Sequence, residues 1–340
     1  MAIVGAGHVG AATLNALVLL GAADQVVLYD RHLARAEGEA WDAADGTPLV
    51  RGVEIVATDD WQALHGADVA VVTVGAPPRK GRSRLDDRNG ALIRHVVARL
   101  DEVAPDAVVV IVTNPVDVMT RVAQEGSARP WHMVLGTGTV LDTARLRLGL
   151  ATRLGVDVQN AHVHVVGEHG ESSFAAWSSA TIGPVPLRSF PLSSKRGSLA
   201  DLEAEVAEGA RRRGPEVLAR IGHTASGIAV AISRIVECVL RDQRRILTLS
   251  SRVPSHYGVG ESLVLSLPCV IGRAGVVRRL PLALDRDEQH KLERSAAILE
   301  RAYRDQADEE LALREHPRAH AELPSAPDGG SSAAGRSRAT

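Results

Sequence analysis

Residues 2–10 read Ala-Ile-Val-Gly-Ala-Gly-His-Val-Gly, and this segment is the strongest indication of the fold. The apolar run 2–4 leads directly into Gly5, Gly7 and Gly10, spaced as G-x-G-x-x-G, and then into a predicted helix over 8–20. The first glycine permits a tight turn, the second lets a ligand approach the backbone, and the third allows close packing of helix on strand. Backbone N–H groups at such a helix start bind phosphate. The intervening His8 and Val9 would line the same loop, so residues 5–10 predict a dinucleotide site.

The end of the next predicted strand, 25–29, selects the dinucleotide. Asp30 follows that strand, twenty residues beyond Gly10. A carboxylate at this place accepts hydrogen bonds from the adenine ribose and repels a 2′-phosphate, which favours NAD over NADP. Arg31 follows immediately and could soften that preference. The alternative is a glycine turn followed by an aspartate that merely caps a helix.

Short β-branched runs alternate with helical patterns from residue 2 to 136, which predicts a Rossmann-type, doubly wound parallel α/β sheet. The expected strands are 2–4, 25–29, 53–57, 69–74, 107–113 and 133–135. Among the expected helices are 8–20, 61–65, 88–103 and 116–125.

After residue 140 the pattern becomes α+β. The expected elements are a helix at 141–154, a strand at 161–166, a strand pair near 175–187, a helical region at 199–241 broken or kinked at Gly214-Pro215, strands at 245–250 and 263–270, and a helix near 285–312. We therefore expect an NAD-binding domain over 1–140, a substrate domain over 141–312, and a disordered tail over 313–340, which is rich in Ser, Ala, Gly, Pro and Arg.

The composition is that of an ordinary soluble globular protein. A formal net charge of −2 gives no general attraction to nucleic acid or acidic membranes. The two cysteines, Cys238 and Cys269, lie far apart in apolar surroundings, so neither a disulfide framework nor a metal site is expected. With no leader pattern and no apolar run of about 18 residues, we expect a cytoplasmic protein.

Three residues of the second half suggest a reaction centre. Asp142 and Arg145 stand in Leu-Asp-Thr-Ala-Arg at 141–145, and His169 stands in Gly-Glu-His-Gly at 167–170. An imidazole can move a proton, a carboxylate can hold it in place, and a guanidinium can bind an acidic substrate.

Two further groups follow strands whose carboxyl ends line the ligand crevice of such sheets. Gly75 and Ala76 follow the fourth strand, and Asn114 follows the fifth in Thr113-Asn114-Pro115-Val116-Asp117. We expect the first two to contact the cofactor. Asn114 is expected to hydrogen-bond the nicotinamide side or the substrate, or to be a turn residue before proline.

From residue 1 to about 312 the chain resembles the L-lactate/L-malate dehydrogenase family. The segments that carry the resemblance are 4–10, Arg84-Leu85-Asp86, 113–117, 138–147, 167–170 and 265–268. Gly138-Thr139-Val140 before Leu-Asp-Thr-Ala-Arg, and Leu-Ser-Leu-Pro-Cys at 265–269, favour the lactate branch.

The resemblance implies a role for each site residue. His169 would be the general acid and base, Asp142 its orienting partner, and Arg145 the clamp on the substrate carboxylate. Arg84 would polarise the reacting carbonyl from a mobile loop. Thr224 and Ile228 match the substrate-pocket and nicotinamide-face positions.

Simpler roles are also possible for these residues. His169 could be a surface-turn histidine, Asp142 a helix cap, and Arg145 a solvated helix residue. For Arg84 the true equivalent could be Arg82 or Arg79.

The loop 77–84, Pro-Pro-Arg-Lys-Gly-Arg-Ser-Arg, departs from the family pattern. Counted back from Arg84 without a gap, Pro78 falls where lactate enzymes resemble one another in carrying Gln and malate enzymes carry Arg. With a one-residue gap, Arg79 takes that place. Glu171 also replaces the Asp usual after His-Gly.

The resemblance also implies assembly and regulation. The chain would form a symmetric homo-oligomer, a dimer or tetramer. Arg147 and His162 occupy positions that resemble the pair binding fructose 1,6-bisphosphate in some bacterial relatives.

The sequence thus predicts an NAD-dependent dehydrogenase that interconverts L-lactate and pyruvate, small 2-hydroxy and 2-oxo acids. The alternatives are an L-malate or branched-chain L-2-hydroxy acid dehydrogenase, and a catalytically silent NAD-binding regulatory protein.

Overall fold

The computed structural model describes residues 1–75, 87–192, 198–260 and 262–315 of the chain. The helices are α1 (His8–Leu20), α2 (Leu33–Gly46), α3 (Asp87–Val103), α4 (Val116–Gly126), α5 (Val140–Leu154), α6 (Leu199–Ile221), α7 (Ser226–Leu240) and α8 (Arg286–Glu315). The strands are β1 (Ala2–Val4), β2 (Gln25–Tyr29), β3 (Glu54–Thr58), β4 (Val69–Val72), β5 (Val108–Ile111), β6 (Val134–Gly136), β7 (Ala161–His162), β8 (Val165–Val166), β9 (Phe174–Ala175), β10 (Thr181–Ile182), β11 (Val185–Pro186), β12 (Arg245–Arg252), β13 (Val264–Gly272) and β14 (Gly275–Arg279).

A nine-stranded sheet organises the molecule, in the order β14-β13-β12-β6-β5-β4-β1-β2-β3. The six strands from β6 to β3 pair in parallel. Strands β2 and β3 are added on one side of β1, and β4, β5 and β6 on the other. The strand order therefore reverses between β1 and β4, and the carboxyl ends of these neighbours form the crevice where doubly wound sheets bind ligands. The predicted Rossmann-type α/β fold is confirmed.

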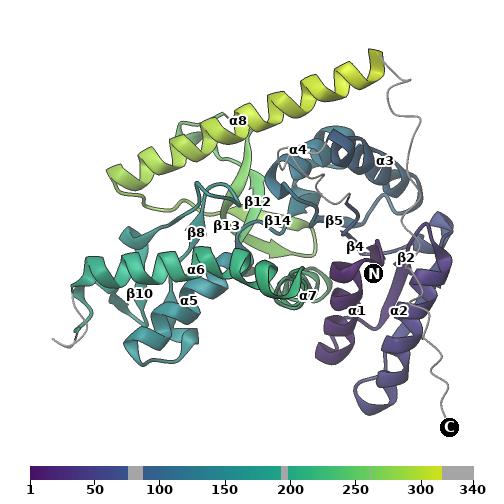
Figure 1. Ribbon diagram of the computed structural model, residues 1–340, viewed down its shortest axis with the longest axis horizontal. Coiled ribbons are helices and arrows are strands. Elements are labelled where there is room, and N and C mark those ends of the chain that lie inside the picture. The colour runs from purple at the N-terminus through teal and green to yellow at the C-terminus, as the bar shows by residue number, and fades with distance from the viewer. Residues whose placement is uncertain (76–86, 193–197, 261, 316–340) are drawn as a thin grey trace, which may run out of the picture.

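Helices cover both faces of the sheet (Figure 1). One face packs against α3, α4 and α8, and the other against α1, α2 and α7. Strand β1 shows why a strand buried on both sides reads as a continuous apolar run: Ala2 and Val4 face the first layer, and Ile3 faces the second. Such a strand holds the loop that follows it on a rigid support.

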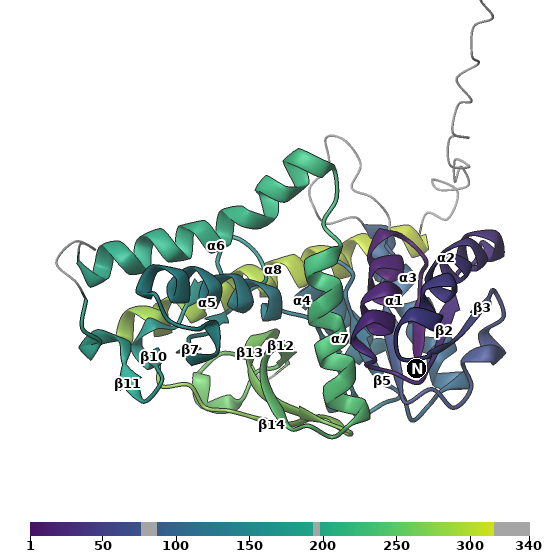
Figure 2. The same ribbon diagram turned by 90° about the horizontal axis from the view of Figure 1, so that it is seen from below.

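Beyond residue 140 the chain extends this sheet and adds a smaller layer. Strands β12, β13 and β14 continue the sheet in antiparallel fashion from β6. A separate apolar cluster joins α5 and α6 to the short strands, with Leu146, Leu150 and Val206 among its buried members. Figure 2 shows α5 and α6 side by side at the end of the molecule away from β3.

Several predicted elements differ in the structure. Residues 161–166 form two strands in two sheets, since β7 pairs with β10 while β8 pairs with β9. The predicted helix at 61–65 is a single 3₁₀ turn, Trp61–Leu64. Helix α2 and the edge strand β14 were not among the named expectations. The buried residues of α2 are small alanines, Ala36, Ala40 and Ala43, and β14 is a short run that ends in two arginines, so both give a weak apolar signal.

Gly214-Pro215 does not end the helix. Helix α6 continues through Pro215 to Ile221 and stops at Gly222, which has a left-handed φ of 78°. Proline removes one N–H donor from the helix, and the buried face of α6 that packs beside α5, with Leu202, Val206 and Ala210, lies on the N-terminal side of Pro215. The expected break is therefore wrong, and a kink is compatible with the bend of the α6 ribbon in Figure 2.

Two expectations about the chain as a whole can be compared with the structure in part. Cys238 and Cys269 are free and buried, as expected. None of the helices in the described part of the chain has the length and apolar character needed to cross a membrane. The predicted disordered tail lies almost entirely outside the described residues.

Candidate active site

The glycine loop after β1 has the shape that a dinucleotide needs. Gly5 has a φ of 111°, a conformation that residues with a Cβ rarely adopt. A Cβ on Gly10 would lie 1.9 Å from the carbonyl oxygen of Gly5, so only glycine lets α1 start this close to the strand. Nothing lies within 4 Å of a Cβ built on Gly7, and this residue caps α1 without a side-chain hydrogen bond. The open N–H groups at this helix start fit a pyrophosphate.

Asp30 lies beside that loop at the end of β2. Its side chain is buried, with Oδ2 accepting the Ala6 N–H at 2.9 Å and Oδ1 accepting the His32 N–H at 2.9 Å. The carboxylate therefore ties β2 to the glycine loop and closes a turn before α2. Helix α2 has its N-cap at His32 without a side-chain hydrogen bond, so the capping alternative is wrong for this helix. Each carboxylate oxygen keeps a lone pair for the predicted ribose contact.

The start of α7 meets the loop and the start of α5. The ring of His8 stacks on that of His223, with centroids 4.5 Å apart. A Cβ built on Gly227 would lie 3.4 Å from the side chain of Leu141, which precedes Asp142. Thr224 is exposed, and Ile228 is half-buried against the α1 layer. The predicted pocket residues therefore flank both the cofactor loop and the reaction centre.

Gly75 and Asn114 follow neighbouring strands, as predicted. Both are exposed, and a Cβ on Gly75 would lie 3.3 Å from the Thr113 side chain. The carbonyl of Asn114 accepts a hydrogen bond of 3.1 Å from the Asn89 side chain, which fixes its backbone to α3. The Asn114 side chain is thus exposed at the carboxyl end of β5, beside β4.

The structure brings His169, Asp142 and Arg145 together. Nδ1 of His169 lies 2.8 Å from Oδ2 of Asp142, and Nη1 of Arg145 donates to Oδ1 of the same carboxylate at 3.1 Å. The His169 side chain is one-third exposed. Because Asp142 holds Nδ1, the Nε2 atom is the one available to a substrate. With both of its oxygens on side chains, Asp142 does more than cap α5.

Burial and the neighbouring charges shift the pKa values of His169 and Asp142 in opposite directions. Burial lowers the pKa of His169, but the hydrogen bond to Asp142 and the negative charges of Asp142 and Asp117 outweigh burial and the positive charge of Arg145, so the pKa is raised. Burial favours a raised pKa for Asp142, but its hydrogen bonds and the charges of His169 and Arg145 lower it. The imidazole therefore holds its proton to a higher pH than a solvated histidine.

Helix α6 lies over the guanidinium of Arg145. A Cβ built on Gly214 would lie 3.4 Å from Nη1 of Arg145. The Arg145 side chain is four-fifths buried, with an exposed fraction of 20%. Partial burial strengthens the attraction of such a cation for a carboxylate.

Sequence reasoning missed Asp117. This residue ends the 113–117 motif, and its buried carboxylate accepts the His169 N–H at 2.7 Å and the Ser250 hydroxyl at 2.6 Å. An aspartate between Val116 and Val118 on the apolar side of a predicted helix was the available signal. Charged residues are seldom fully buried without a specific partner.

The loop 77–84, which the resemblance predicts to be a mobile lid over the site, cannot be compared with the structure. Ala76, Pro78, Arg79, Arg82 and Arg84 all lie outside the described residues. Their assignments stay predictions.

Arg147 and His162 lie on neighbouring elements, α5 and β7. Nε of Arg147 donates to the Val163 carbonyl at 2.9 Å, and its Nη2 lies 3.4 Å from Nδ1 of His164. Burial and the charges of Arg147 and His162 lower the pKa of His164 to about 4. The Arg147 guanidinium thus has partners within the chain, while His162 is exposed. Binding of fructose 1,6-bisphosphate stays a prediction.

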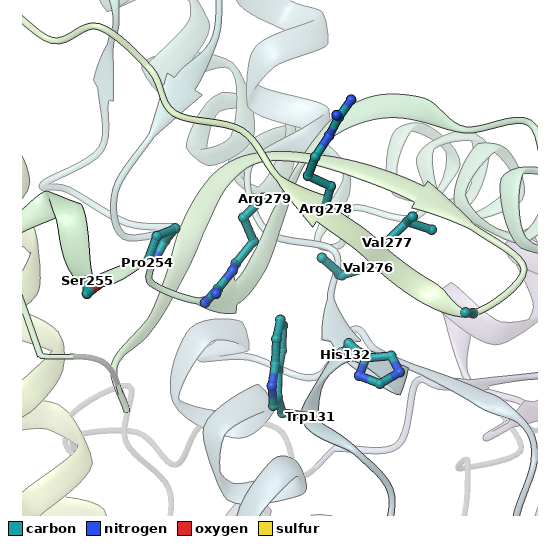
Figure 3. Close-up of a pocket in the computed structure, with 9 residues that line it drawn as sticks. Trp131, His132, Pro254, Ser255, Val276, Val277, Arg278 and Arg279 are labelled. Atoms are coloured by element: carbon teal, nitrogen blue, oxygen red, sulfur yellow. The ribbon is translucent and has the colours of Figure 1, made fainter.

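A cavity of about 650 Å³ lies elsewhere, along β14. Arg279 reaches over the ring of Trp131, with its Cζ 4.7 Å from the centroid, while Arg278 points to the opposite side of the strand (Figure 3). Nη1 of Arg279 also donates to the Arg252 carbonyl. The residues that line this cavity include none of the predicted site residues.

Known proteins resemble this chain along most of its length. The family model of the lactate/malate dehydrogenase NAD binding domain matches residues 1–136. The model of the lactate/malate dehydrogenase alpha/beta C-terminal domain matches residues 139–310. An L-lactate dehydrogenase of Thermoanaerobacter sp. (strain X514) is 38% identical over 301 residues, 88% of this chain and 96% of that protein. An L-lactate dehydrogenase of Synechococcus sp. (strain JA-3-3Ab) is 40% identical over 299 residues, 87% of this chain and 96% of that protein.

Solved structures also resemble this chain over most of its length. A lactate dehydrogenase from a Medee basin deep-sea metagenome library superimposes with a TM-score of 0.86 and 32% identity, covering 90% of this chain and 98% of that one. The minor L-lactate dehydrogenase of Enterococcus mundtii gives 0.85 and 30%, covering 89% and 97%. The predicted resemblance and the NAD cofactor are confirmed. With both family domains matched in order along one Rossmann-type sheet, the chain belongs to the lactate/malate dehydrogenase family.

Proposed function

We propose that this chain is an NAD-dependent L-lactate dehydrogenase that interconverts L-lactate and pyruvate. The observation that carries the proposal is the contact of His169 with Asp142 at 2.8 Å and of Asp142 with Arg145 at 3.1 Å. A proton donor beside a partly buried guanidinium suits a substrate with a carboxylate next to its reacting carbonyl. The names of the relatives, L-lactate dehydrogenase, point to the same substrate.

The residues divide the reaction between them. Arg145 binds the carboxylate of pyruvate, which places the C2 carbonyl oxygen toward Nε2 of His169. When bound, NADH supplies the hydride to C2. Protonated His169 gives its Nε2 proton to the carbonyl oxygen, while Asp142 holds the Nδ1–H and stabilises the charged ring. In lactate oxidation neutral His169 takes the hydroxyl proton instead. Arg84 would polarise the carbonyl from the lid, and Asn114 and Thr224 would line the pocket.

A three-substrate assay tests this proposal. NADH oxidation is followed with pyruvate, oxaloacetate and 2-oxoisocaproate, and NADH binding is measured separately by its fluorescence. We expect the highest kcat/KM with pyruvate. A preference for oxaloacetate would instead assign the malate reaction and point to Arg79 as the partner of the second carboxylate. Binding of NADH without turnover of any of the three would mean a silent binder.

We also propose that the enzyme works as a cytoplasmic homo-oligomer. Trp41, Leu148 and Val230 each expose more than half of their surface on three different helices. Single exposed apolar side chains are common on monomers too, so the resemblance to the lactate/malate dehydrogenase family carries this proposal. Light scattering should give a mass of two or four chains of 36.0 kDa each, and the mass of one chain would contradict the proposal.

A further inference from the structure

A second buried carboxylate lies behind the catalytic histidine. Asp117 stands in the first turn of α4 with 2% of its surface exposed. Its Oδ2 accepts the backbone N–H of His169 at 2.7 Å, and its Oδ1 accepts the Ser250 hydroxyl at 2.6 Å. One side chain therefore joins α4, β12 and the 167–170 turn.

The packing around this carboxylate requires small neighbours. A Cβ on Gly136 would lie 2.3 Å from Oγ1 of Thr120 and 2.8 Å from Cβ of Ser250. Glycine in β6 therefore lets α4 and β12 approach each other across that strand. The close approach brings the Ser250 hydroxyl to Asp117.

The turn that carries His169 is held at three consecutive residues. Gly167 exchanges backbone hydrogen bonds with Ser266, at 3.0 and 2.9 Å. The Glu168 N–H donates to the Ser295 hydroxyl at 3.2 Å, and the His169 N–H donates to Asp117. Of these three partners only Asp117 is ionisable.

The hydrogen bonds alone do not require a charge at residue 117. Asparagine has the same shape: its Oδ1 could accept the His169 N–H, and its Nδ2 could donate to the Ser250 oxygen. Burial, and to a smaller extent the charge of Glu168, raise the pKa of Asp117 to about 6, against the hydrogen bonds of Ser250 and His169 and the charge of His169. A buried carboxylate costs free energy unless a nearby cation offsets the cost.

The protonated imidazole ring of His169 is a cation that can offset the cost of burying the Asp117 charge. Asp142 and Arg145 face this ring from α5, Asp117 faces it from α4, and Glu168 precedes it in the turn. The Asp142 charge is shared with Arg145 through the 3.1 Å ion pair. A second carboxylate on the other side of the histidine would compensate for that sharing.

We propose that Asp117 is a positioning residue that fixes the backbone of His169 and, through its negative charge, helps the imidazole keep its proton for pyruvate reduction. This inference rests on the proposed function, in which protonated His169 is the acid. Asp117 acts through His169 and contacts neither substrate nor cofactor.

The pH profile of Asp117→Asn tests the inference. Pyruvate reduction needs protonated His169, so kcat/KM is full below the histidine pKa and falls as pH rises through it. Removing the Asp117 charge should lower that pKa and move the falling limb to lower pH. At the pH where the wild type keeps half of its activity, we expect the variant to be lower by about two- to fivefold, with near-normal activity at more acidic pH.

Other variants separate charge from structure. Asp117→Glu should restore the limb. Ser250→Ala removes a hydrogen bond that favours the charged form of Asp117, so it should move the limb in the same direction as Asp117→Asn but by less. Asp101→Asn is the matched control, because Asp101 pairs with Arg129 far from the site and its loss should lower the unfolding temperature without moving the limb. If Asp117→Asn does not fold, the pair Asp117→Glu and Asp117→Gln gives the same comparison.

Each outcome has one meaning. Equal loss of activity at every pH, with an unmoved limb, would overturn the charge role and leave Asp117 a structural residue. If the wild type does not reduce pyruvate at all, the proposed function fails. If it does and the limb stays in place, only the inference about Asp117 fails.

Discussion

Replacement of His169 by asparagine should lower kcat for pyruvate reduction by about 10²–10⁴-fold, the range typical of a lost general acid. Asparagine can still donate to Asp142 at the Nδ1 position, but it has no titratable group at the Nε2 position. Stopped-flow or steady-state NADH oxidation measures the loss. Affinity for NADH should change little, because the glycine loop after β1 is held by Asp30 and by packing around Gly10.

The control for this prediction is an exposed histidine. His290 lies on α8, outside the site, and His290→Asn should keep wild-type kinetics. A loss smaller than tenfold in His169→Asn would mean that another group delivers the proton.

Replacement of Arg145 by lysine should raise the KM for pyruvate by about 30- to 150-fold, equivalent to about 2–3 kcal/mol for a charged, two-point hydrogen bond. Lysine keeps the positive charge but lacks the planar fork that matches a carboxylate. The lysine can still pair with Asp142, so the His169 contact should persist and kcat should fall less than in His169→Asn. Steady-state kinetics with varied pyruvate, together with NADH fluorescence titration, gives both constants.

Arg153→Lys is the matched control for Arg145→Lys. Arg153 lies on the same helix two turns later and pairs with Glu205 at the surface. Its replacement should leave KM unchanged. An unchanged KM in Arg145→Lys as well would remove this residue from the carboxylate-binding role.

Much of the α/β sheet could be predicted from the sequence because its signals are local. Runs such as Val108–Ile111 are apolar without alternation, since helices cover both faces of the strand. The edge strand β14 was missed although it forms a tight hairpin with β13, because its run Gly-Val-Val-Arg-Arg is short and its last three residues are not buried. Likewise 161–166 reads as one strand, although its two halves join different sheets.

The sequence predicted that Asp142 would be the partner of His169, but it did not predict the contact of Asp117 with the same histidine. His169, Asp142 and Arg145 stand in short motifs whose residue types suggest their chemistry. Asp117 stands in a motif too, but its importance lies in the hydrogen bond to His169, 52 residues away, and in that from Ser250, 133 residues away. No periodicity in the chain encodes such a contact.

From the amino-acid sequence alone one can predict the glycine turn, the alternation of strands and helices, and His169, Asp142 and Arg145 as the candidate acid, its partner and the anion-binding residue. Each of these follows from local backbone sterics, from the burial pattern, or from side-chain chemistry. The meeting of α4, α5, β12 and the 167–170 turn is visible in the folded chain alone. It places two carboxylates on His169, Asp142 at the ring and Asp117 at the backbone N–H. Strand order and helix packing fix such meetings, because a buried polar group takes its partner from whichever segment the fold brings alongside.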